Sequence, residues 1–197
     1  DCGGGVWRVP WENAKLDATV SEGIGYGMLL TVTFGDQEAF DGLYAYYNQA
    51  LTPATGLMNW LRYGCDAHHE LKYNEYPDGA AADADLDVAM ALIMADCKWG
   101  GGGYAGEATK VISNIRQHMF GRSGDYELLL PGDSAFYHEL GDRCVNYSYF
   151  APAYYRVFAQ YESNEAGFWN KAADDSYPLL SQASNGTTGL VRNWGNG

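Results

Sequence analysis

Residues 84–99 constrain the fold more than any other part of the chain, because they are apolar on nearly every side of a helix. A helix of that kind has to be buried all round. Acidic residues stand at every second position around its start, at Asp83, Asp85 and Asp87. Residues at this spacing do not share one face of a helix, so at least one of them is expected to point into a pocket. The pattern predicts a central helix with an acidic mouth at its N-terminal end.

Apolar residues at helical spacing, with glycines and prolines between them, predict five further helices. Ser21 and Ser148 are suitable N-cap residues. Pro152 fits the start of a helix, where the first backbone N–H groups lack partners. The predicted helices cover residues 21–34, 36–51, 84–99, about 104–120, a stretch starting near Tyr149, and 165–183. Residues 1–19, 52–80, 121–145 and 186–197 are predicted to be irregular, with a short hairpin near 57–60.

The six helices fall into three consecutive pairs. The first helix of each pair is richer in apolar, small or aromatic residues, and the second is more amphipathic. Long loops precede the third and fifth helices, whereas a plain bundle usually has shorter connections. We therefore predict an all-α fold in which hairpins of inner and outer helices form part of a ring. Parallel inner helices would bring three clusters to one mouth, namely Ser21-Glu22, Asp83-Asp85-Asp87 and Asn146-Tyr147-Ser148-Tyr149.

This predicted mouth contains the residue types that glycoside hydrolysis needs. One carboxyl group protonates the leaving oxygen, another activates water, and flat rings hold the sugars. Glu22 is followed by Gly23, Gly25 and Gly27, each of which costs a helix about 1 kcal/mol, so a close approach of backbone or ligand is indicated. A structural interpretation competes with this one, because acidic residues at a helix start also stabilise the helix dipole and aromatic residues also fill cores.

A general acid has to keep its proton near neutral pH, whereas a helix N-terminus lowers the pKa of a carboxylic acid. Burial and a neighbouring negative charge act in the opposite direction. We therefore expect Asp83 to lie within a few ångströms of Glu22, and Glu22 to be partly buried.

Charge and composition restrict the partners. The net charge of −13 argues against nucleic acid, because phosphate binding needs a basic surface. No run of about 18 apolar residues is present, so no membrane span is expected. The four cysteines are too widely spaced for a zinc motif, and secretion would allow one or two disulfides. His68 and His69 are not at metal-ligand spacing. Neither a metal nor an organic cofactor is expected.

Three segments occur in the order found in one enzyme family. They are Thr19-Val20-Ser21-Glu22-Gly23-Ile24-Gly25-Tyr26-Gly27-Met28, Ala81-Ala82-Asp83-Ala84-Asp85-Leu86-Asp87-Val88-Ala89 and Asn146-Tyr147-Ser148-Tyr149-Phe150-Ala151-Pro152-Ala153-Tyr154-Tyr155-Arg156. Through them the chain resembles glycoside hydrolase family 8, which includes cellulases, chitosanases, lichenases and xylanases. The resemblance implies an (α/α)6 barrel, inversion at the anomeric carbon, a proton donor at Glu22, and at Asp83 a catalytic-site aspartate close to the cleaved sugar.

Two positions depart from the family pattern. Ala82 stands where the family usually has Ser or Thr, which removes a hydrogen bond near Asp83. Tyr149 stands where the cellulase-type branch has its general-base aspartate. The resemblance therefore does not identify the general base. Candidates within the chain are Asp133, Glu139 and Asp142, and a base outside the chain is the alternative.

Length is the third departure. Family members have about twice as many helices as the six predicted here, and an incomplete ring would expose a large apolar face. We therefore expect residues 1–197 to be a partial catalytic domain, roughly half of a barrel. The remainder would be missing or supplied by another chain, with the complementary C-terminal part of the barrel as a possible partner.

The sequence thus predicts a secreted, inverting, endo-acting hydrolase of β-1,4 linkages in a polysaccharide, with cellulose or a β-glucan as the first candidate. A chitosanase or xylanase of the same family is one alternative, and the negative charge favours chitosan among them. An inactive carbohydrate-binding relative is another. Glu22 and Asp83 are the predicted catalytic residues. The predicted substrate-binding residues are Trp60, Trp11, Tyr149, Asp85 and Tyr26.

Overall fold

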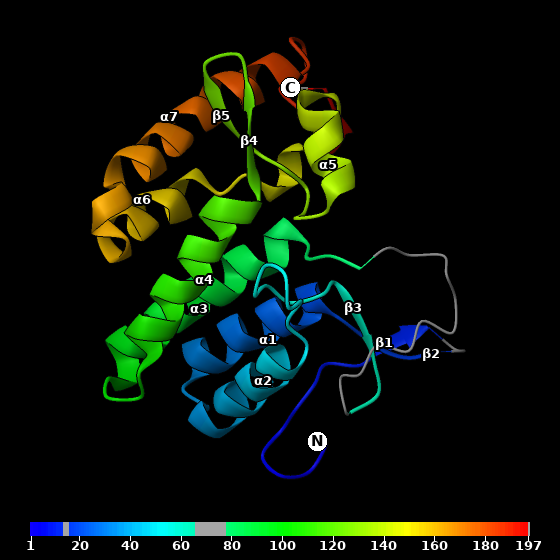
Figure 1. Cartoon of the computed structure of the whole chain (residues 1–197), viewed down its shortest axis with the longest axis vertical. Coiled ribbons are helices and arrows are strands. Elements are labelled where there is room, and N and C mark those ends of the chain that lie inside the picture. The colour runs from blue at the N-terminus through cyan, green and yellow to red at the C-terminus, as the bar shows by residue number, and fades with distance from the viewer. Residues whose placement is uncertain (14–15, 66–77, 197) are drawn as a thin grey trace.

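The computed structural model describes residues 1–13, 16–65 and 78–196. Four long helices form the first half of the fold in two antiparallel pairs (Figure 1). Helix α1 (Ser21–Phe34) turns at Gly35 into α2 (Gln37–Gln49), and α3 (Ala82–Trp99) turns into α4 (Tyr104–His118). The paired arrangement and the approximate bounds agree with the sequence prediction. The predicted helix over 104–120 ends earlier, because Phe120 enters a strand.

The second half of the fold holds the third helical pair, α6 (Pro152–Tyr161) and α7 (Ala166–Ala183). Pro152 occupies the first turn of α6, as predicted. The predicted cap at Ser148 is wrong, because residues Tyr147–Tyr149 form a short 3-10 turn and the Ser148 backbone N–H donates to the Asn146 side chain (3.1 Å). The helix therefore begins three residues later than expected.

The cap predicted at Ser21 is also wrong. Val20 is the N-cap residue, and Ser21 already belongs to α1. The backbone N–H of Ser21 donates to the carbonyl oxygen of Trp60 (2.9 Å), so a neighbouring segment satisfies a backbone donor that needs a partner at a helix start. This bond fixes the start of α1 against the chain around Trp60.

Several segments predicted to be irregular contain short strands and an additional helix. The N-terminal region forms an antiparallel sheet of β1 (Trp11–Asn13), β2 (Leu16–Val20) and β3 (Leu61–Tyr63). Residues 121–145 contain most of a hairpin of β4 (Phe120–Ser123) and β5 (Tyr126–Leu129), then α5 (Ala135–Leu140) and a 3-10 turn, Gly141–Arg143. The tail pairs β7 (Trp194–Gly195) with β6 (Val145–Asn146). These pairings join residues far apart in sequence, which local patterns do not report.

The short hairpin predicted near residues 57–60 is present only as an antiparallel bridge between Met58 and Leu51, with the Asn59 N–H donating to the carbonyl oxygen of Ala50 (3.0 Å). Asn59 also bridges to Ala80. The segment is therefore held between the end of α2 and the approach to α3. The adjacent histidines, His68 and His69, lie outside the described residues.

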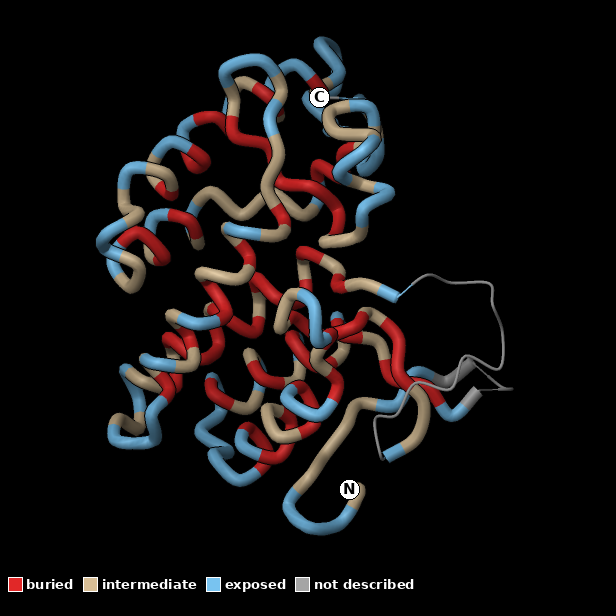
Figure 2. The backbone as a smooth tube through the Cα atoms, viewed as in Figure 1, coloured by how far each residue is buried: buried red, intermediate tan, exposed pale blue. Residues whose placement is uncertain are grey.

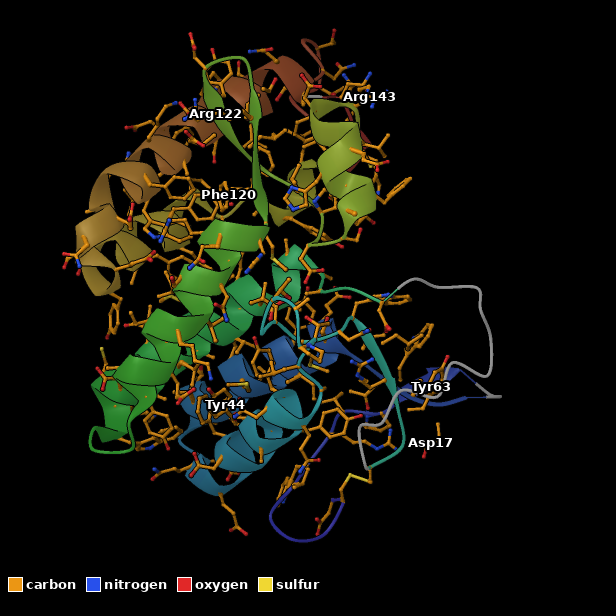
Figure 3. The ribbon with its side chains drawn as sticks, viewed as in Figure 1. Asp17, Tyr44, Tyr63, Phe120, Arg122 and Arg143 are labelled. Atoms are coloured by element: carbon orange, nitrogen blue, oxygen red, sulfur yellow. A yellow bond between two sulfur atoms is a disulfide. The ribbon has the colours of Figure 1, made fainter. Side chains whose placement is uncertain are left out.

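The helices pack around one main core (Figure 2). Helix α3, predicted to be buried on nearly every side, lies largely inside it, with Leu86, Val88 and Leu92 at most 1% exposed. Only its C-terminal end departs from the prediction, because Cys97 and Lys98 are exposed. Phe120, which is labelled in Figure 3, follows α4 and joins the two halves. Its ring contacts Tyr155 and Trp169 edge-on at centroid distances of 5.8 and 5.7 Å. A smaller cluster lies between β5, β6 and α7.

One stripe of α1 remains open to solvent. Tyr26, Leu30 and Phe34 follow Glu22 at intervals of four residues and are 52%, 58% and 82% exposed. Large apolar side chains at this helical spacing normally pack against another element. The exposed apolar face expected for an incomplete ring is therefore present on α1.

Candidate active site

Helices α1 and α3 lie side by side and run in the same direction. Near their starts, a β-carbon placed on Gly25 would lie 3.0 Å from the carbonyl oxygen of Ala84. Near their ends, the Lys98 ammonium donates to the carbonyl oxygens of Val32 and Thr33 (2.8 and 3.0 Å). Because the two helices start at the same end, Glu22 and Asp83 project from adjacent first turns. Of the three glycines that follow Glu22 in α1, Gly25 therefore marks a close approach of two backbones.

Glu22 lies on the exposed side of this helix pair. The Tyr26 hydroxyl, one turn further along α1, donates to Glu22 Oε1 (3.1 Å). The expected partial burial of Glu22 is wrong: the side chain is exposed. The stripe of α1 that carries it has no helix packed over it among the described residues, which accounts for the exposure.

Asp83 is the half-buried carboxyl group of the pair. The pKa of Asp83 is raised to about 6, mainly by burial and also by the negative charges of Glu22 and Asp87, while a hydrogen bond from the Ala84 backbone lowers it. Asp83 Oδ1 is enclosed and accepts no hydrogen bond from the described residues. Asp83 is therefore close to equal populations of acid and carboxylate in mildly acidic solution.

Asp87 belongs to the same acidic cluster. Its pKa is also raised to about 6, mainly by burial, while a hydrogen bond from Tyr154 lowers it and the charge of Glu22 raises it. Asp87 was predicted as part of the acidic mouth, but neither it nor Tyr154 was named as a site residue. The pairing of Asp87 with Tyr154 brings the first turn of α6 to the start of α3.

The third predicted cluster reaches the same place through Tyr149. Burial raises the pKa of the Tyr149 hydroxyl, and the charges of Asp83 and Glu22 raise it further. Electrostatic coupling of this kind requires proximity. The structure thus brings together the starts of α1 and α3 and the segment before α6. This agrees with the prediction that the three clusters meet at one mouth.

A cavity of about 300 Å³ adjoins this cluster. Its aromatic wall consists of Trp60, Tyr137, Tyr149 and Trp194, and Tyr149 and Trp194 lie with ring centroids 6.4 Å apart. Trp60 and Tyr149 were predicted from the sequence to bind substrate. Tyr137 and Trp194 were missed, because they lie in α5 and in the β7 strand, two regions that the sequence did not predict to be structured. The remaining lining residues are Asp78, Gly79, Ala80, Ala81, Pro131 and Ser134.

Two predicted substrate-binding residues lie elsewhere. Asp85 is 0% exposed, and its Oδ1 accepts hydrogen bonds from the Tyr47 hydroxyl (2.6 Å) and the Met58 backbone (3.3 Å). Direct contact of Asp85 with substrate is therefore wrong for this structure, because helical geometry turns it away from Asp83 and into the core. Trp11 is 42% exposed on β1 and does not line the aromatic cavity.

The three base candidates have different surroundings. Asp133 accepts hydrogen bonds from Thr55 and from the Ala80 backbone (2.5 and 2.7 Å). Asp142 accepts from the hydroxyl of Ser123 on β4 (3.2 Å), and Glu139 is exposed on α5. The largest causes of the raised pKa of Asp83 are burial and the charges of Glu22 and Asp87, and none of the three candidates is among them. All three stay predictions for the base.

Within residues 1–13, 16–65 and 78–196, no group of three or more His, Cys, Asp or Glu side chains is arranged to bind a metal ion. Across those same residues, every helix is too short or too polar to cross a bilayer.

Acidic side chains beside a cavity with aromatic walls are the residue types that glycoside hydrolysis uses. The family model for glycosyl hydrolases family 8 matches residues 3–196. The chain belongs to this family, and its all-α fold corresponds to roughly half of an (α/α)6 barrel.

Individual relatives agree with this assignment. The chain is 41% identical to Endoglucanase A of Acetivibrio thermocellus, over 97% of this chain and 39% of that protein. It is 43% identical to Endoglucanase 2 of Ruminiclostridium josui, over 96% of this chain and 39% of that protein. A solved β-1,3-1,4-glucanase from Paenibacillus sp. X4 superposes with a TM-score of 0.82 at 28% identity, over 98% of this chain and 51% of that one. The chain thus spans about two fifths to half of the length of these relatives.

Proposed function

We propose that this protein hydrolyses β-1,4 linkages within a glucan chain, with inversion at the anomeric carbon. The observation that carries the proposal is the meeting of Glu22 and Asp83, from two helices distant in sequence, beside a cavity lined by aromatic rings. Family membership and the endoglucanase names of its relatives support the same chemistry.

The proposed roles follow from the surroundings of each group. Glu22, on the open side of α1, donates its proton to the glycosidic oxygen, and the Tyr26 hydroxyl holds its carboxyl group in place. Asp83, half-buried behind it, orients the attacking water or holds the sugar in a distorted conformation. Inversion needs room for water between acid and base, whose carboxyl groups lie about 6.5–9.5 Å apart in such enzymes. The aromatic wall stacks on the neighbouring sugar rings.

Reducing-sugar release from cellulose, lichenan, xylan and chitosan tests this proposal. We expect turnover on the glucans, a 10²- to 10⁴-fold lower kcat for Glu22→Gln, and an inverted anomer in NMR spectra of the fresh product. Equal activity of the parent and Glu22→Gln would remove Glu22 from its role. Faster release from chitosan or xylan would identify the protein as a chitosanase or a xylanase. Binding without turnover would identify it as an inactive carbohydrate-binding relative.

We also propose that a complementary set of helices covers the exposed stripe of α1. Leu30 and Phe34 are more than half exposed on this stripe, and the relatives are about twice as long or more. Adding the C-terminal half of a family 8 barrel as a separate chain should protect the backbone amides of α1 from hydrogen exchange. No change in exchange along α1 would contradict this proposal.

Secretion is the third part of the proposal. Polysaccharides lie outside cells, and a Cys2–Cys65 disulfide joins the N-terminal segment to the end of β3, as in proteins from oxidising compartments. Non-reducing peptide mapping of the natively produced protein should recover the Cys2–Cys65 pair. Free thiols at both positions would argue against secretion.

A further inference from the structure

Asp85 is a buried carboxyl group that the proposed reaction does not use directly. It lies on the first turns of α3, two residues after Asp83, and is completely inaccessible to solvent. One oxygen, Oδ1, accepts both the Tyr47 hydroxyl of α2 and the backbone N–H of Met58. The other, Oδ2, is enclosed and has no hydrogen-bond partner among the described residues. Asp85 therefore ties α3 to α2 and to the segment that contains Met58.

The segment held by Asp85 leads directly to the aromatic cavity. Met58 is followed by Asn59 and Trp60, and the Trp60 backbone is bonded on both sides. Its N–H donates to the carbonyl oxygen of Gly79 (2.9 Å), and its carbonyl oxygen accepts the N–H of Ser21 (2.9 Å), next to Glu22. A continuous path thus joins Asp85 through Met58 and Trp60 to the start of α1.

We propose that Asp85 is a positioning residue, which holds Asp83, Trp60 and the start of α1 in their relative places through its bonds to Met58 and Tyr47. This inference rests on the proposed function. It replaces the substrate contact predicted for Asp85 from the sequence. A displacement of about 1 Å at a catalytic group can cost about 100-fold in rate, so the bonds of a buried side chain can affect catalysis without touching substrate.

Asp85 performs this role as an uncharged acid. Its pKa is raised to about 8, mainly by burial and also by the charges of Asp133 and Asp83, whereas the hydrogen bonds from Tyr47 and Met58 lower it. These are the groups that face it from α2, from the segment around Met58, from α3 and from the loop before α5. Below pH 8 the proton resides on the carboxyl group, and Oδ1 remains the acceptor for both donors.

Asparagine is the conservative replacement for a neutral carboxylic acid at this site. Its Oδ1 accepts the same two hydrogen bonds, and its amide nitrogen takes the place of the enclosed Oδ2. In Asp85→Ala the shared acceptor Oδ1 is lost, and the Met58 N–H and the Tyr47 hydroxyl are left buried and unpaired. Tyr47→Phe removes only the hydrogen bond from the Tyr47 hydroxyl and keeps the aromatic ring. It provides a milder variant if Asp85→Ala does not fold.

The experiment compares kcat and KM for a soluble β-glucan at pH 6, together with hydrogen exchange of the Met58 amide. We expect Asp85→Asn to keep kcat/KM within about threefold of the parent. Asp85→Ala should lower it at least tenfold and speed exchange of the Met58 amide at least tenfold, with Tyr47→Phe between them. The Thr52 amide, which donates to Leu57 in the same segment, should keep its protection and serves as the internal reference.

Asp175→Ala is the matched control. Asp175 is also a buried aspartate that accepts a backbone N–H, from Glu127 (2.7 Å), and it pairs with Lys171. It lies on α7 and does not line the aromatic cavity. This variant should lose stability yet keep the kcat/KM of the parent, so a general loss of stability is separated from a loss of positioning.

Three results would overturn the inference. They are parent-like kcat/KM in Asp85→Ala, an equal loss in Asp85→Asn and Asp85→Ala, and unchanged Met58 exchange in Asp85→Ala. A parent protein that hydrolyses none of the four polysaccharides would end the proposed function instead. In that case exchange of the Met58 amide alone decides whether Asp85 holds the segment.

Discussion

Gly25 of α1 lies against Ala84 of α3 so closely that a β-carbon on Gly25 would come within 3.0 Å of the Ala84 carbonyl oxygen. It would also lie 3.0 Å from Cβ of Asp87. Backbone cannot move aside as the end of a flexible side chain can, so this glycine sets the separation of the two helices. The same separation places Glu22 and Asp83 on adjacent turns.

Gly25→Ala should therefore destabilise the protein, even though alanine is the better helix former by about 1 kcal/mol. Overpacking costs of about 1–3 kcal/mol exceed that gain, and the rate of hydrolysis should fall as the helices separate. Gly106→Ala on α4 is the control, because a β-carbon there meets nothing within 4 Å, and it should raise stability. Urea unfolding of both variants measures the two effects, and a stabilised Gly25→Ala would refute the close approach.

Activity should depend on the ionisation of Asp83. Its pKa is raised to about 6, and the proposed role in orienting water uses the carboxylate. The rate should therefore rise as the pH increases through about 6. Asp83→Asn should abolish this rise and lower kcat about 100-fold or more. The pH dependence of kcat/KM for both proteins is the measurement, and an unchanged profile in Asp83→Asn would exclude Asp83 as its source.

Asp85 should affect stability in the opposite pH direction from a salt-bridged carboxylate. Its folded-state pKa of about 8 lies above the value of about 3.9 in an unfolded chain. Between about pH 4 and pH 8 the Asp85 carboxyl group is therefore protonated in the folded protein and ionised in the unfolded chain. The contribution is fully present below about pH 4 and is lost as the pH rises to 8, by about 1.4 kcal/mol per pH unit for one proton. Urea unfolding at pH 5, 7 and 9 should show a flatter dependence in Asp85→Asn. Parallel curves would contradict the raised pKa.

Tryptophans that line the aromatic cavity should contribute more to substrate binding than a tryptophan outside it. Trp60→Ala and Trp194→Ala should each raise KM, because apolar surface removed from water contributes about 25 cal/mol per Å². A sugar face that covers roughly 20–60 Å² of each ring therefore contributes about 0.5–1.5 kcal/mol, which corresponds to roughly two- to tenfold in KM. Trp11→Ala should have a smaller effect, because Trp11 does not line the cavity. Titration of each variant with a cello-oligosaccharide checks the order, and a larger effect at Trp11 would reverse it.

The main helices and the three clusters of the candidate site could be predicted from the sequence, because both depend on local patterns. Each prediction came from residues close together in the chain. The apolar run of α3 predicted a buried helix, the glycines after Glu22 a close approach, and the aspartates before Leu86 and Val88 an acidic mouth. Trp194 and Tyr137 could not be predicted as cavity residues. Trp194 reaches the cavity through the pairing of β7 with β6, and no short-range pattern records a strand contact across that distance in the chain.

The sequence by itself determined where the long helices lie, and which carboxyl groups stand at the starts of the inner helices, because periodicity and chain breakers act over a few residues. Only the tertiary structure decided which of these carboxyl groups is exposed, half-buried or fully enclosed. Glu22, Asp83 and Asp85 are alike in sequence context, yet they differ in solvent access. Desolvation and neighbouring charge, which set the pKa of a carboxyl group, arise from packing between segments distant in the chain.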